Sequence, residues 1–170
     1  MSQESNSAKR HFSDLFGDIG SAWGLPKDAC RVHALIYVNS AAMSLQTICE
    51  VLELSKTVAI EAINFLTEYD LAWSIDEDTY GVHGDPWEAL MTGLDKRRGQ
   101  DLPAMRASLD NCRKEFSANI AGAGQVGKLI DLIDDMSAIH AQTFRLSPRV
   151  LRTMVGFSGR AARMFAGNRR

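Results

Sequence analysis

Residues 43–82 read MSLQTICEVLELSKTVAIEAINFLTEYDLAWSIDEDTYGV, and their pattern alone predicts a local fold. Two amphipathic segments follow one another with only Glu53 and Leu54 between them, and each begins at a serine that can cap a helix, Ser44 and Ser55. The pattern then changes to a two-residue alternation over 71–75, an acidic turn at 76–78 and a return strand over 79–82. Helix, helix and hairpin in this order predict a winged helix-turn-helix.

The regions on either side of this stretch are predicted to be helical. Apolar residues at helical spacing predict an N-terminal helix that ends near Gly20 and a second helix with Pro26 in its first turn. Further helices are predicted over 86–98, from Pro103 onward, over 126–140 and over 148–167. We therefore expect a mainly α fold in three parts, which are an N-terminal helix (1–22), a winged helix-turn-helix domain with a small β-hairpin wing (23–84), and a C-terminal helical region that ends in a basic tail helix (85–170).

Length and composition limit the class of protein. A chain of 170 residues with 45% hydrophobic residues suits one globular domain with appended helices. No apolar run approaches the roughly 18 residues of a membrane span, so we expect no membrane contact. The polar N-terminus and three cysteines without a Cys-x-x-Cys pair favour a cytoplasmic protein without disulfides or a cysteine zinc site.

The charge is distributed unevenly along the chain. Residues 1–135 carry 12 Lys and Arg against 21 Asp and Glu, whereas residues 136–170 carry seven arginines and no acid. An arginine-rich tail on an acidic body indicates either an anionic partner or an acidic docking surface on the same protein.

Six short segments, in order across residues 23–94, carry a resemblance to a known family. They are 23–26 (WGLP), 31–37 (RVHALIY), 43–49 (MSLQTIC), 54–56 (LSK), 66–71 (LTEYDL) and 85–87 (DPW). In these segments the chain resembles the GbsR-type branch of the MarR family of bacterial transcriptional regulators. The resemblance implies a cytoplasmic homodimer that binds double-stranded DNA as a repressor or activator. It also implies that N- and C-terminal dimerisation helices flank the winged domain, and that the helix after Ser55 enters the major groove.

Candidate DNA-binding residues follow from this resemblance and from the tail. In the winged domain they are Ser44, Gln46, Ser55, Lys56, Thr57, Asn64 and, on the wing, Tyr80. In the tail they are Arg149, Arg152, Arg160 and Arg163, which fall within an arc of roughly 80° at about 100° per residue. These arginines could hold phosphates, and a dimerisation helix with a solvated basic face explains the same pattern.

The residue types on the expected DNA surface also support an interpretation of a different class. Lys56 is the sole Lys or Arg between Val32 and Gly93, and the wing tip reads Asp76-Glu77-Asp78. Acids at a wing tip oppose phosphate binding. The alternative is therefore a winged-helix protein-interaction module that has lost strong DNA binding, with Val58, Ile60 and the acidic wing as its contact surface.

Other motifs have a structural explanation. Residues 122–127 (GAGQVG) match a dinucleotide fingerprint, but a helix precedes them where that motif needs a strand, so they are interpreted as a helix break. The four histidines form no spaced metal pair, and His33 is interpreted as a partly buried side chain on an apolar helix face. No nucleophile, base and acid stand at catalytic spacing, so we expect no catalytic residue, no metal, no cofactor and no enzyme.

A small-molecule effector and a protein partner remain open. Trp73, Trp87 and Tyr80 are candidate walls of a pocket for a cationic osmolyte, an idea that the family's link to choline and glycine betaine suggests. Packing of these rings between the wing and the following helix is the simpler explanation.

Overall fold

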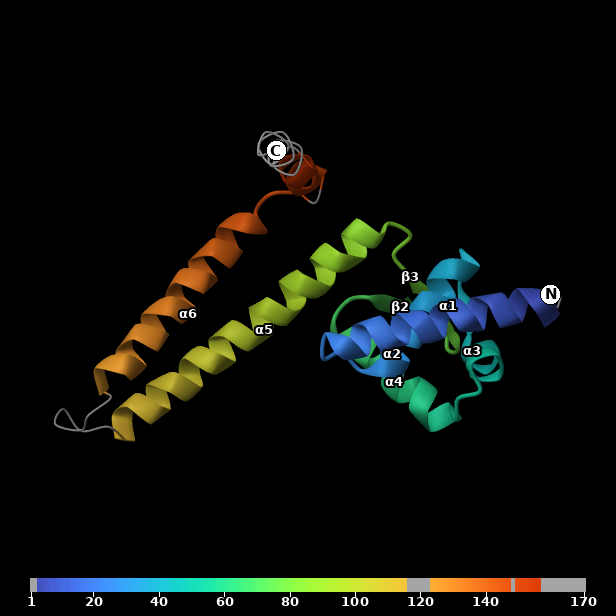
Figure 1. The fold of residues 1–170 in the computed structure, drawn as a ribbon, viewed down its shortest axis with the longest axis horizontal. Helices are drawn as coiled ribbons and strands as arrows, with labels where there is room; N and C mark the ends of the chain where they lie inside the picture. Colours follow the sequence, from blue (N-terminus) through green and yellow to red (C-terminus); the bar gives the residue numbers. More distant parts are fainter. Residues whose placement is uncertain (1–2, 116–122, 148, 157–170) are drawn as a thin grey trace, which may run out of the picture. The chain divides into compact units, whose positions relative to one another are not determined.

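The structure of the chain is a computed structural model that describes residues 3–115, 123–147 and 149–156, and it divides into two compact units, Met1–Gly93 and Leu94–Arg170. The first unit holds helices, a small sheet and the first residues of α5 (Pro86–Glu115) (Figure 1). The elements that lie wholly within it are α1 (Gln3–Ala22), α2 (Lys27–Asn39), β1 (Met43–Ser44), α3 (Leu45–Leu52), α4 (Lys56–Glu68), β2 (Ala72–Ser74) and β3 (Thr79–Val82). None of the helices described is both long and apolar enough to cross a membrane.

The core of the first unit lies among α2, α3 and α4. The largest fully buried apolar side chains are Val32 and Leu35 of α2 and Ile48 and Leu52 of α3, and α4 adds Ala59, Ala62, Ile63 and Leu66. These positions are the apolar stripes of the three helices, so burial of one face of each helix brings them together. The helix-turn-helix pattern predicted from residues 43–68 is confirmed in its elements.

The sheet has three short antiparallel strands in the order β1-β3-β2. Strands β2 and β3 form the predicted hairpin, with Trp73 opposite Gly81 and Ser74 opposite Tyr80. Strand β1 was not predicted, because a strand of two residues is too short to show alternation. It pairs with β3 through Met43 opposite Tyr80, and so ties the start of the helix-turn-helix to the wing.

The prediction of two helices on either side of Pro103 was wrong. A single helix, α5 (Pro86–Glu115), runs through this proline. Proline removes one backbone hydrogen bond and crowds the carbonyl four residues earlier. Here that residue is Gly99, whose backbone can adjust. The neighbouring Leu102 is buried, so packing holds the helix where the local signal alone would end it.

In the second unit, α5 and α6 (Ala123–Thr143) run antiparallel and side by side (Figure 1). Ion pairs join them, with Arg106 Nε 2.7 Å from Asp134 Oδ1 and His140 Nε2 2.9 Å from Asp95 Oδ1. Residues 123–127 of the glycine motif are helical and begin α6, so the helix break predicted over 122–127 does not fall at these residues, and residues 116–122 before them lie outside the described residues. Residues 149–156 are helical, and the rest of the predicted tail helix lies outside the described residues.

Candidate nucleic-acid interface

Two serine caps fix the start of α3 and of α4. The Ser44 hydroxyl oxygen accepts a hydrogen bond from the Thr47 backbone N–H at 3.2 Å, and Ser55 accepts one from Val58 N–H at 3.3 Å. Each cap satisfies one of the four free N–H groups at a helix start. Ser44 also bonds Thr47 Oγ1 at 2.9 Å and is half-buried. Its hydroxyl group is therefore committed to the fold, whereas Ser55 is exposed.

The predicted recognition helix presents a solvent face of mixed chemistry. Lys56 and Thr57 in its first turn are exposed, as is Asn64 two turns later. The apolar Ile60 stands between them at 38% exposure, and the side chain of Val58 is half-buried. Val58 lies one turn before the buried Ala62 and Ile63 on the core side of the helix.

Acidic side chains share this surface, and they are the residues that the predicted site missed. Glu61 and Glu68 are exposed on α4, and Glu50 is exposed on α3, where Gln46 Nε2 donates to Glu50 Oε1 at 2.8 Å. Their spacing could have revealed them, because residues three, four and seven apart on a helix share a face. The predicted contact Gln46 is thus exposed but bonded within its own helix.

Tyr80 and the tip of the wing differ in their exposure. Tyr80 is half-buried and packs against the core, opposite Ser74 and Met43 in the sheet. The tip residues Asp76, Glu77 and Asp78 are exposed. Hydrogen bonds from Thr79 and from the Asp78 backbone N–H lower the pKa of Asp76, so this carboxylate stays ionised at neutral pH.

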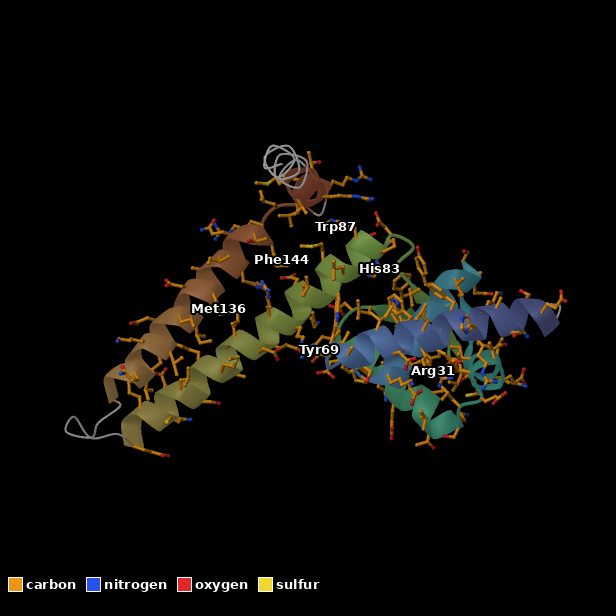
Figure 2. The ribbon with its side chains drawn as sticks, in the orientation of Figure 1. Arg31, Tyr69, His83, Trp87, Met136 and Phe144 are labelled. Carbon is orange, nitrogen blue, oxygen red and sulfur yellow. The ribbon has the colours of Figure 1, made fainter. Side chains whose placement is uncertain are left out.

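Arg31, labelled in Figure 2, joins three helices of the first unit. Its guanidinium donates to Asp14 of α1 at 2.8 Å, to Asp28 of α2 at 2.9 Å and to the Leu52 carbonyl at the end of α3 at 3.1 Å. A planar group with five donors suits such a junction. The side chain is 12% exposed and is therefore committed to the fold.

Little positive charge is available on the first unit. Residues 1–93 contain five Lys and Arg against 14 Asp and Glu. Four of the five cations are bonded: Arg10 to Glu53, Lys27 to Asp18, Lys9 to Asn39, and Arg31 as above. Among the described residues Lys56 has no ion-pair partner. It is therefore the available cation of the predicted groove-facing surface.

The second unit carries the opposite charge. Residues 94–170 contain 14 Lys and Arg against seven Asp and Glu. Arg149 and Arg152 are exposed in the helical turn 149–156. Arg160 and Arg163 lie outside the described residues. The predicted cluster of four arginines is thus described for its first half only.

The three aromatic residues considered as candidate walls of one pocket do not line a groove together. Trp73 lines an open groove on the outer face of the wing, and neither Trp87 nor Tyr80 is among the residues that line it. Elsewhere in the described residues, no group of three His, Cys, Asp or Glu side chains could hold a metal ion. His33 is half-buried, as expected.

Comparisons with known proteins address the fold alone. No family model matches the chain, and no curated protein sequence does. A solved crystal structure described as a transcriptional regulator is similar, with a TM-score of 0.65 and 15% sequence identity, over 78% of this chain and 92% of that chain. The chain therefore shares the fold of that protein, and its helices and small antiparallel sheet are consistent with a winged helix.

Proposed function

We propose that the chain is a DNA-binding transcriptional regulator that acts as a homodimer. The proposal includes its place in the GbsR-type branch of the MarR family, which rests on residues 23–94. The observation that carries it is the exposed first turn of α4, where Ser55, Lys56 and Thr57 stand free of the core at the start of the second helix of a helix-turn-helix. The similar fold of a protein described as a transcriptional regulator supports it.

The N-terminus of α4 is suited to phosphate or base contact. The N–H groups of a helix start carry partial positive charge, and Lys56 adds a full charge at the same end. Asn64, two turns along the exposed face, can bond a base edge through its amide. Lys56 and Asn64 would then supply position and specificity respectively.

The second unit supplies the charge that the first unit lacks. Its excess of Lys and Arg, with Arg149 and Arg152 exposed, provides the cations that neutralise phosphates. In this proposal the winged domain reads the groove and the arginines hold the backbone.

A titration of duplex DNA tests the proposal. Fluorescence anisotropy of a labelled duplex from the promoter region next to the chain's own gene should show saturable binding that weakens with salt. Each phosphate contact contributes a slope of about 0.9 in log K against log salt. Lys56→Ala should lower that slope by about 1, and Arg149→Gln with Arg152→Gln by about 2. Lys27→Ala is the matched control, because Lys27 is an exposed lysine of the same unit paired with Asp18.

Two results would contradict the proposal. One is the absence of saturable binding by the intact chain, and the other is a slope that Lys56→Ala and Lys27→Ala change equally. Circular dichroism of each variant verifies that the helices are intact.

The acidic surface favours a second candidate function, a protein-interaction module. Glu50, Glu61 and Glu68 on the two helices of the helix-turn-helix are exposed, as are the wing acids, and these are the elements that would contact DNA. Reversal of Asp76, Glu77 and Asp78 to lysine separates the two functions. A DNA-binding regulator should gain affinity for duplex DNA, whereas an interaction module should bind no DNA in either form and lose its protein complexes.

A further inference from the structure

An open groove of about 560 Å³ lies on the outer side of the wing, within the first unit. We call it the wing groove. Its walls are the last turn of α2, the following turn at residues 40–42, and the face of the sheet that points away from the core. The side chains that matter for binding are Tyr37, Val38, Trp73, Ile75 and His83.

The wing groove exposes apolar and aromatic surface. Trp73 is 43% exposed and Ile75 is 58% exposed, although both belong to a small domain with a complete core. The indole of Trp73 lies across Gly81, which leaves room for the ring because an added Cβ would stand 3.1 Å from Nε1. The His83 ring meets it edge-on, with the ring centroids 5.1 Å apart. The groove therefore presents an aromatic wall.

The electrostatics of the wing groove favour a cation. None of the lining residues is Lys or Arg. The wall from α2 is a helix C-terminus, which carries partial negative charge. Asp76, Glu77 and Asp78 follow directly after the lining residue Ile75, and Glu88 Oε2 lies 4.0 Å from His83 Nδ1. Lys9, which bonds Asn39 at the end of α2, is not a lining residue.

A guanidinium group fits this combination of walls. It stacks on an indole face, and carboxylates accept its N–H groups. The chain itself contains such a ligand. Residues 157–170 read FSGRAARMFAGNRR, with four arginines, no acid and three large apolar side chains at Phe157, Met164 and Phe165. They follow the helical turn 149–156, which adds Arg149 and Arg152.

We propose that the wing groove binds the arginine-rich C-terminal segment, residues 149–170, of a second copy of the chain. Arginine side chains stack on Trp73 and pair with the wing acids, while the apolar side chains cover Val38 and Ile75. Two copies that exchange these segments make two identical contacts and close as a dimer, because each copy carries both the groove and the segment. This contact extends the homodimer of the proposed function and does not rest on DNA binding.

Binding of the segment in trans tests the assignment. The receptor is the full chain in which Arg149, Arg152, Arg160, Arg163, Arg169 and Arg170 are replaced by Gln, so that its groove has no competing segment. The ligand is a fluorescein-labelled peptide of residues 149–170, and anisotropy gives its Kd at low and moderate salt. We expect saturable binding that weakens with salt, and weaker binding to the wild-type chain, whose own segments compete.

Substitutions in this receptor locate the contact. Trp73→Ala should raise the peptide Kd at least tenfold, and Glu77→Gln with Asp78→Asn should raise it several-fold. Trp23→Ala is the matched control, since Trp23 is 73% exposed on the same unit and does not line the groove. Equal affinity for the Trp73→Ala and Trp23→Ala receptors would overturn the proposal, and so would the absence of saturable binding.

Sedimentation of the full chain distinguishes binding of the segment between two copies from binding of the segment within one copy. Exchange between copies predicts that Trp73→Ala and the arginine-to-glutamine chain both dimerise at least threefold more weakly than wild type. Unchanged dimerisation would overturn the assignment to a second copy. None of these measurements uses DNA, so their failure and the failure of the DNA titration are independent.

Discussion

His33 is a histidine whose surroundings oppose protonation. It is half-buried on α2, and its ring stacks on Phe16 of α1 with centroids 6.4 Å apart. Among the described residues its buried Nε2 has no hydrogen-bond partner. Burial, with a smaller contribution from the charge of His83, lowers the pKa of His33 to about 4.

This lowered pKa predicts a loss of stability in mild acid. The unfolded chain binds the proton near pH 6.5 and the folded chain only near pH 4, so stability is full above pH 6.5 and falls as the pH drops between these values. From pH 7 to pH 5 the group should remove about 2 kcal/mol from the free energy of unfolding. Urea denaturation at the two pH values measures it. His33→Leu should abolish this part of the decrease, and His11→Leu, at an exposed position of α1, should not. An equal decrease in wild type and His33→Leu would contradict the prediction.

At the residue scale, the sequence predicted what depends on near neighbours. The caps of Ser44 and Ser55 bond N–H groups three residues away, so a local pattern contains both partners. Arg31 donates hydrogen bonds to Asp14 and to the Leu52 carbonyl, which are 17 and 21 residues away in the sequence. No local pattern indicates either partner. Tyr80 was predicted to contact DNA. The structure adds that Tyr80 is half-buried and packs against the core, a contact that no local pattern indicates.

At the scale of elements, helix α5 contains two residues that weaken it. Pro103 removes the hydrogen bond to the Gly99 carbonyl, and Gly99 itself lowers helix propensity. A Cβ built at Gly99 meets nothing within 4 Å. We therefore expect Gly99→Ala to raise the free energy of unfolding by about 0.5–1 kcal/mol.

Thermal and urea denaturation measure this change. Gly81→Ala is a control of opposite sign, because its Cβ would stand 3.1 to 3.3 Å from three atoms of the Trp73 ring, which must move. Stability lowered by Gly99→Ala would show that the flexibility of Gly99 is needed for α5 to pass Pro103.

The elements that sequence patterns missed are those decided by packing. Pro103 after a polar run is a reasonable helix start on local grounds, yet α5 continues through it, with Leu102 beside it buried. Strand β1 exists because Met43 and Ser44 pair with residues of the wing. Glu53 takes a left-handed backbone conformation, with φ of 54°, to end α3, although no glycine stands there to predict it.

At the scale of the whole molecule, the near-neutral net charge is a poor guide. An acidic first unit and a basic second unit cancel in the total of −2. The two units carry net charges of opposite sign. On this basis DNA affinity would come from the second, basic unit, and cation binding from the first, acidic unit. The sequence contains this asymmetry in full. The structure adds that four of the five cations of the first unit are bonded within it.

Dimerisation is the remaining prediction for the whole molecule, and α6 carries it. Ile130 and Ile133 are buried, but a second apolar stripe on the same helix is exposed, with Leu132 at 51% and Ile139 at 63%. With Leu129 and Met136 it falls within an arc of roughly 80° at about 100° per residue. A continuous exposed stripe of this kind indicates an interface, and a second copy offers the same stripe in return.

Leu132→Glu with Ile139→Glu should raise the dimer dissociation constant at least tenfold in analytical ultracentrifugation, because each substitution would bury a charge in the interface. Ala138→Glu, at an exposed position of α6 that lies about 100° or more around the helix from each residue of this stripe, should leave it unchanged. Retention of the dimer by the double variant, with helix content intact by circular dichroism, would place the interface elsewhere.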